Sequence, residues 1–188
     1  MAILVLGIAT WQRNLVWQSE ISLWEDTLRK SPHKVRVLYN YGTYLADAGR
    51  AEQALPFLSK AVTLDPQYAD AWHNLGRAYL MTNRVAEAVA PLRTAVRLKP
   101  EMDNATVNLS AALINSGKPR EAMVLLERNL HHFPNWPEVR YNLGVCYVRV
   151  GDLPAARGEL ALLRRLDPKL AGLLDDLIHQ VGTAAPPQ

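Results

Sequence analysis

The chain has 188 residues, of which 49% are hydrophobic and 21% are charged. This length suits one domain of ordinary size, and the balance of apolar and charged residues excludes extensive disorder. The formal net charge is only +3, and basic residues are spread among acidic ones along the chain. A nucleic-acid-binding protein concentrates its Lys and Arg on one face, so the composition argues against nucleic acid as a partner.

The first segment, residues 1–34, opens with an almost wholly apolar run from Met1 to Trp11. The run is shorter than the roughly 20 residues that cross a membrane, and it lacks the positively charged start of a signal peptide. Two interpretations stay open. The run is either a buried terminal helix or the last turns of a transmembrane helix, with Trp11 and Arg13 at the membrane interface.

The rest of this segment contains no helix breaker from Asn14 to Lys30. We therefore expect one helix there, ended by Pro32. In the repeat register described next, this helix is the second half of a degenerate repeat. Trp24 is then expected to pack on the helix that follows.

A repeating pattern runs through the remainder of the chain. A small residue, an alanine and a proline each keep one register, which is the signature of a helical repeat array. The period is constant, since 76 − 42, 110 − 76 and 144 − 110 each give 34 for the small residue. The three kinds of residue stand at Gly42, Gly76, Ser110 and Gly144, at Ala54, Ala88, Ala122 and Ala156, and at Pro32, Pro66, Pro100, Pro134 and Pro168.

This pattern resembles the tetratricopeptide repeat (TPR), a helix-turn-helix unit of about 34 residues. The units are then 35–68, 69–102, 103–136 and 137–170. The resemblance implies an all-α fold, a right-handed α–α superhelix of paired helices A and B. The small residues at positions eight and twenty are expected to let helix B approach helix A of the same repeat, because a larger side chain there would overpack the contact.

Two positions vary between the repeats. Position four, where the family places a large apolar residue, holds Leu38, Trp72, Thr106 and Arg140. Position twenty-seven is small in the first two repeats, but Asn129 and Leu163 depart from that pattern in the last two. We expect looser or differently angled packing between those last repeats.

The turn between the two helices carries a residue that tolerates the left-handed conformation. These residues are Gly49, Asn83, Gly117 and Gly151. Pro119 and Pro154 near the start of helix B are harmless, since the first N–H groups of a helix are unpaired anyway. Pro56 and Pro91 lie deeper in helix B, where we expect a local bend.

The end of the chain is expected to close the array. Residues 171–181 are amphipathic and suit a capping helix, whose polar face meets water while its apolar face covers the last repeat. Residues 182–188 are rich in Ala and Pro, and we expect them to be unstructured.

No constellation for catalysis, metal binding or cofactor binding stands out. His131 and His132 are adjacent, so on a helix they point in different directions and make a poor metal pair. Cys146 cannot form an internal disulfide because it is the only cysteine, and in an apolar helix it suits a small core residue. We therefore expect a binding protein, with a protein or peptide ligand, rather than an enzyme.

The resemblance places helix A along the concave groove of the array. Position six is asparagine in every repeat, and an amide can both donate and accept hydrogen bonds. Two interpretations stay open: a ladder that grips an extended peptide backbone, or a position used for structure alone. The residues expected in the groove are Asn40, Asn74, Asn108 and Asn142, with Tyr39, His73, Tyr141, Arg36, Arg77 and Arg149 beside them.

Residues 10–44 also resemble the junction between the membrane part and the repeats in bacterial transmembrane-and-TPR O-mannosyltransferases. The likeness is carried by Thr10 to Asn14, Trp17, Leu23 to Asp26, Lys30 to Pro32 and Arg36. This resemblance implies a location on the extracytoplasmic, periplasmic side of a membrane rather than in the cytoplasm. Three hypotheses follow: a stand-alone adaptor, the repeat domain of a membrane glycosyltransferase, or a structural protein that self-associates end to end.

Overall fold

A computed structural model describes residues 20–132 and 134–183 of the chain. Within these residues it contains ten α-helices and no strand, which confirms the all-α prediction. The chain divides between Asn83 and Arg84 into two compact units. The apolar run from Met1 to Trp11 and the predicted helix as far as residue 19 lie outside the described residues.

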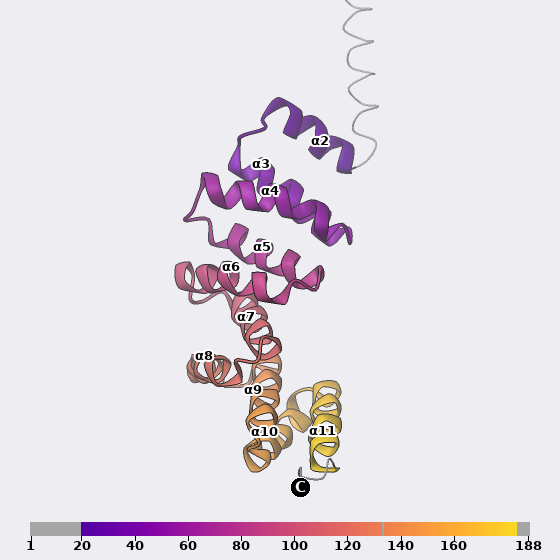
Figure 1. The fold of residues 1–188 in the computed structure, drawn as a ribbon, viewed down its shortest axis with the longest axis vertical. Helices are drawn as coiled ribbons and strands as arrows, with labels where there is room; N and C mark the ends of the chain where they lie inside the picture. Colours follow the sequence, from indigo (N-terminus) through magenta and orange to yellow (C-terminus); the bar gives the residue numbers. More distant parts are fainter. Residues whose placement is uncertain (1–19, 133, 184–188) are drawn as a thin grey trace, which may run out of the picture. The chain divides into compact units, whose positions relative to one another are not determined.

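The first unit has four described helices that pack on one another in chain order (Figure 1). The core between them consists mainly of leucines and alanines, with Leu45, Ala54 and Leu58 completely buried. Trp24 packs against this core, as expected for the half-repeat helix. The helices are α2 (Glu20–Lys30), α3 (Val35–Asp47), α4 (Ala51–Leu64) and α5 (Ala69–Met81).

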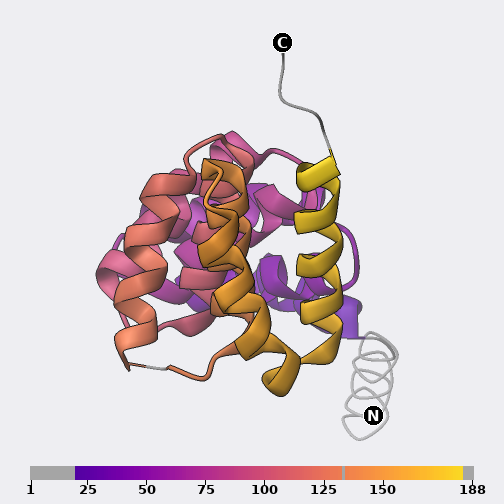
Figure 2. The same cartoon turned by 90° about the horizontal axis from the view of Figure 1, so that it is seen from below.

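The second unit has six helices. Each packs on the next, and α9 also contacts both α7 and α11. Figure 2 shows α11, in yellow, running beside the orange helices of the last repeat. The six are α6 (Val85–Leu98), α7 (Asp103–Asn115), α8 (Pro119–His132), α9 (Pro137–Val150), α10 (Leu153–Leu166) and α11 (Pro168–Thr183).

The helices keep the period read from the sequence. The four A helices begin at residues 35, 69, 103 and 137, and 69 − 35, 103 − 69 and 137 − 103 each give 34. The turn residues all have the predicted positive φ, at 75° for Gly49, 58° for Asn83, 73° for Gly117 and 85° for Gly151. Each turn needs this backbone conformation, which glycine and asparagine adopt readily. The residue at the turn therefore ends helix A and lets the chain reverse into helix B.

The small residue at position eight permits close approach, but its partner differs between the two units. A Cβ atom added at Gly42 would lie 2.7 Å from Cγ of Leu58 in α4, which is helix B of the same repeat, as predicted. At Gly144 the nearest atom is Cδ2 of Leu174 in α11, 2.5 Å away. At Gly144 the nearest atoms therefore belong to the capping helix, a contact that the sequence did not predict.

The side chain at position four makes different contacts in different repeats. Leu38 is buried in the core of the first unit. Trp72 donates its indole N–H to the carbonyl oxygen of Pro66 at 2.9 Å. Arg140 donates Nε–H to the carbonyl oxygen of Pro134 at 2.7 Å and pairs with a carboxylate on α10. The long side chains thus place their polar ends on the proline that precedes their own helix, which lets arginine stand where the family has an apolar residue.

The capping helix is longer than predicted. It begins at Pro168 rather than 171, because the Asp167 carboxylate accepts hydrogen bonds from the first N–H groups, those of Lys169 and Leu170. It ends at Thr183, so the expectation of an unstructured tail was wrong for Gly182 and Thr183. The remaining tail residues lie outside the described part of the chain.

Helices α4 and α6 continue through Pro56 and Pro91. The bend expected at these prolines stays a prediction. Pro56 is exposed on α4. Pro91 is buried on α6, where its ring replaces an apolar side chain.

Candidate functional site

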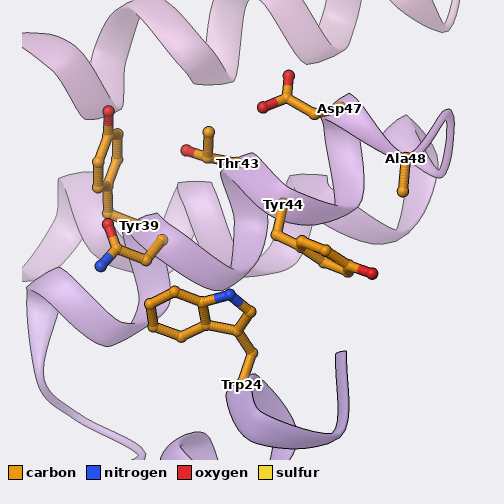
Figure 3. Close-up of a pocket in the computed structure, with 7 residues that line it drawn as sticks. Trp24, Tyr39, Thr43, Tyr44, Asp47 and Ala48 are labelled. Atoms are coloured by element: carbon orange, nitrogen blue, oxygen red, sulfur yellow. The ribbon is translucent and has the colours of Figure 1, made fainter. Parts of the chain in front are cut away.

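Residues of α3 that were predicted to face the groove line a hollow of about 610 Å³ in the first unit (Figure 3). Tyr39, Asn40, Thr43 and Asp47 follow one another along α3 at the spacing of one helix face. Trp24 closes the hollow from α2, and Figure 3 shows its indole ring reaching toward α3. The hollow therefore combines aromatic walls with an amide, a hydroxyl and a carboxylate.

The aromatic wall is held in place by the fold. The Tyr39 ring lies against Tyr68 with the ring centroids 4.8 Å apart. Burial raises the pKa of the Tyr68 hydroxyl, so it stays protonated. Trp24 and Tyr44 also line the hollow, although sequence reasoning did not include them in the groove. The expected packing of Trp24 on the following helix was the one signal that could have found it.

The predicted groove residues of α5 make contacts with α3. Asn74 is buried, and its amide donates a hydrogen bond to Oγ1 of Thr43 at 2.8 Å. Arg77 forms an ion pair with Asp47. Both contacts join position six or nine of one helix A to the groove residues of the preceding helix A, so these two side chains tie the repeats together.

His73 stands next to these residues on α5. Its pKa is lowered below the ordinary value of 6.5, because burial disfavours the charged ring and the Arg77 guanidinium adds repulsion. The imidazole is therefore neutral at pH 7, and both its ring nitrogens together offer one donor and one acceptor.

In the second unit, the asparagine at the same repeat position, Asn142, also joins two helices. Asn142 is buried, and its amide donates to Oγ of Ser110 at 2.9 Å and to the carbonyl oxygen of Val107 at 3.4 Å. The Ser110 hydroxyl in turn donates to the Val107 carbonyl. These bonds close the contact between α7 and α9 without leaving the Asn142 N–H groups for a ligand.

The ten predicted groove residues thus fall into different environments. Tyr39 and Asn40 meet in the hollow of the first unit, and the described residues show no hydrogen-bond partner for Asn40. Asn108 and Tyr141 are half-buried, while Arg36 and Arg149 are exposed. The side chains of Asn74, Asn142 and Arg77 join neighbouring repeats to one another. Whether any of them contacts a peptide stays a prediction.

The described residues offer no group of three or more His, Cys, Asp or Glu side chains that could hold a metal ion. Burial raises the pKa of the Cys146 thiol to about 12, so this thiol is a poor nucleophile at pH 7. From residue 20 to residue 183, residue 133 apart, the structure has no helix that combines the length and the apolar character of a membrane span.

The family model of the tetratricopeptide repeat matches residues 45–113 and 113–177. The chain belongs to the tetratricopeptide repeat family. This agrees with the alternating A and B helices and with the left-handed turns between them. The resemblance read from the period of the sequence is therefore confirmed.

The relatives of this TPR chain include much longer proteins. It is 35% identical over 77 residues to protein O-mannosyl-transferase TMTC1 of Homo sapiens, a match that spans 39% of this chain and 9% of that protein. The chain therefore covers a small part of the length of that relative. This similarity confirms the likeness to O-mannosyltransferases with repeats, while their activity belongs to the whole proteins.

Solved TPR structures share the fold. The crystal structure of YrrB, described as a TPR protein with an unusual peptide-binding site, matches with a TM-score of 0.68 and 21% identity over 86% of this chain and 93% of that one. A crystal structure of MamA matches with a TM-score of 0.69 and 22% identity, over 85% and 89% of the two chains. At these identities the likeness concerns the fold alone.

Proposed function

We propose that the chain is a protein-interaction scaffold that binds an extended peptide segment of a partner along its A helices, without catalysing a reaction. The TPR fold supports a scaffold role. The observation that carries the finer proposal is the hollow beside α3, with Trp24 and Tyr44 as aromatic contacts and Asn40 as an amide. Aromatic residues around a few polar groups are typical of the energetic centres of protein interfaces.

The chemistry of the hollow favours a peptide backbone beside an apolar side chain. Asn40 can donate to a carbonyl and accept from an N–H of the same peptide unit. Thr43 already accepts the Asn74 amide, but its hydroxyl can still donate. The Trp24 ring supplies apolar area for a side chain of the ligand, since indole faces bury much surface.

The test is to select peptides from a displayed library on the full chain and to measure their affinities by calorimetry. Replacing Asn40 and Tyr44 together by alanine is expected to weaken binding by roughly tenfold or more, because hot-spot truncations cost about 1–2 kcal/mol or more. The matched control replaces the exposed Leu64 and Gln67 by alanine in the same unit. Unchanged affinity in the hollow variant, with its helix content retained, would disprove this binding site.

A second candidate is the repeat part of a larger membrane glycosyltransferase, in which the array would hold the acceptor protein on the extracytoplasmic side. The similarity to protein O-mannosyl-transferase TMTC1 favours it. Sequencing the gene upstream of Met1 tests it directly. A reading frame that continues through several membrane spans supports this candidate, and an in-frame stop codon before Met1 excludes it.

A further inference from the structure

The hollow beside α3 has two parts of different chemistry. Figure 3 shows the Trp24 ring between Tyr39 and Tyr44, whereas Asp47 and Ala48 lie farther along α3, at its C-terminal end. Among the described residues that line the hollow, Asp47 is the one charged residue. The hollow therefore has an aromatic part and an acidic part, and none of these lining residues is basic.

The carboxylate of Asp47 is open to a ligand. Its side chain is 56% exposed. Oδ1 of Asp47 accepts a hydrogen bond from Nη2 of Arg77, while Oδ2 has no partner among the described residues. Since an ionised carboxylate offers about four lone-pair sites, Asp47 can pair with Arg77 and still accept hydrogen bonds from a second cation.

The end of α3 also favours a cation. Asp47 is the last residue of α3, where the helix carbonyl groups create a partial negative charge, and the last turn contains no basic residue. At the same repeat position, α9 has Arg149, whose charge complements the helix end. Met81 and Asn115 hold this position in the second and third repeats. Among the four repeats, the first thus has an acidic residue at this helix end.

The spacing along α3 limits where a peptide can present a cation. A peptide that lies along α3 has the Trp24 ring between Tyr39 and Tyr44 (Figure 3). Asp47 follows these two residues by about 12 Å and about 4.5 Å along the helix axis, at 1.5 Å per residue. In an extended peptide, side chains two residues apart point to the same side and lie about 6.6 Å apart. This distance falls within that range.

We propose that the peptide in this hollow carries a basic side chain that binds Asp47, two residues away from the apolar side chain that lies on Trp24. The inference rests on the proposed function and adds the charge of the bound segment to it. A lysine or arginine suits this part of the hollow, because its methylene stem can lie on the exposed Ala48 while its charged tip meets the carboxylate.

The binding test uses a fluorescein-labelled capped pentapeptide, Arg-Ser-Leu-Ser-Arg, and the full chain, with anisotropy as the readout. An arginine lies two residues from the leucine on both sides, so the direction of the peptide along α3 does not matter. Replacing both arginines by citrulline, which has a similar shape and no charge, should weaken binding roughly fivefold or more. The peptide Ser-Arg-Leu-Arg-Ser keeps the charge and should bind roughly threefold more weakly or worse, because its arginines point away from the leucine side.

The protein variants test the role of the carboxylate. Asp47→Asn should weaken binding of the arginine peptide roughly fivefold or more, and should change binding of the citrulline peptide less than about twofold. A purely structural role of Asp47 would weaken both peptides equally. Arg77→Met should strengthen binding of the arginine peptide about twofold to fivefold, because it frees Oδ1 of Asp47 and removes a competing cation.

The matched control is Glu52→Gln, which removes the same charge at an exposed position of α4 that does not line the hollow. This change should leave binding of the arginine peptide unchanged. A loss as large as that of Asp47→Asn would show a general attraction between charges and would overturn the inference.

The outcomes separate this inference from the proposed function. If the arginine and citrulline peptides bind equally, and both lose affinity when Asn40 and Tyr44 are replaced by alanine, the basic side chain is wrong and the peptide site stands. If both bind but neither loses affinity in that variant, the site and the inference are wrong together. If the arginine peptide does not bind, the inference is wrong, and the library selection described above decides the proposed function separately.

Discussion

In each unit, an asparagine at position six of the repeat joins one A helix to the preceding A helix. The hydrogen-bond partner of this asparagine differs between the two units. In the first unit Asn74 of α5 donates to the Thr43 hydroxyl, which lines the hollow beside α3. In the second unit Asn142 of α9 donates to Ser110, which is completely buried. One position of the repeat thus serves structure in both units, but only in the first does its partner also face a ligand-sized space.

The partner of the asparagine depends on the residue at position eight of the preceding A helix. Position eight of α3 is Gly42, which has no hydroxyl, so Asn74 bonds to position nine. Position eight of α7 is Ser110, whose hydroxyl accepts the Asn142 amide and donates to a backbone carbonyl. The residue at position eight therefore decides whether the asparagine hydrogen bond ends on a buried hydroxyl, as at Ser110, or on one that lines the hollow, as at Thr43.

The largest effect is expected from filling the close contacts at position eight. Gly42→Ala should destabilise the protein by about 2 kcal/mol, because the new Cβ meets the branched Cγ of the buried Leu58. Gly144→Ala should cost about 1 kcal/mol, since the nearest atoms are the movable ends of Leu174. Denaturant unfolding measures both.

The control for this pair is Gly158→Ala on α10, where an added Cβ meets no atom within 4 Å. This change should stabilise the protein by up to about 1 kcal/mol through helix propensity. If Gly42→Ala were as stabilising as Gly158→Ala, close approach of α4 would not be the reason for glycine at that position.

The next effect concerns the two asparagines themselves. Asn142→Ala should lower the free energy of unfolding by about 2 kcal/mol, and Asn74→Ala by about 1 kcal/mol, because water can reach the half-buried Thr43 but not Ser110. Urea titration of each variant provides the measurement, with the exposed Asn115→Ala as a control that should change little. Equal losses would show that the two contacts are equivalent after all.

The smallest effect is a pH dependence confined to the first unit. The pKa of His73 is lowered in the folded chain from 6.5, so the unfolded chain takes up the proton first as the pH falls. The contribution of His73 to stability is therefore complete above about pH 6.5 and decreases below it. His73→Gln should lose less stability than the unchanged protein between about pH 7.5 and pH 5.5. An identical pH profile for both proteins would contradict burial as the cause.

Much of the fold could be predicted because it depends on local residues. The turns at Gly49 and Gly151 need a backbone conformation that few residues adopt, and the helices between them follow from the apolar stripe. The partner of Gly144 could not be predicted, because the close approach of Leu174 depends on where α11 packs. The end of α11 was also missed, since composition near the terminus resembles that of an unstructured tail.

The candidate sites show the same division. By itself, the sequence determined the repeat length, the family, the helix pairs and the register of Asn40, Asn74, Asn108 and Asn142, because the period of the repeat is visible in the chain alone. Only the tertiary structure decided that Asn74 and Asn142 join helices and that Trp24 helps to form a hollow. The physical reason is that burial and hydrogen-bond partners of a side chain depend on helices about 15 to 35 residues away in a repeat array.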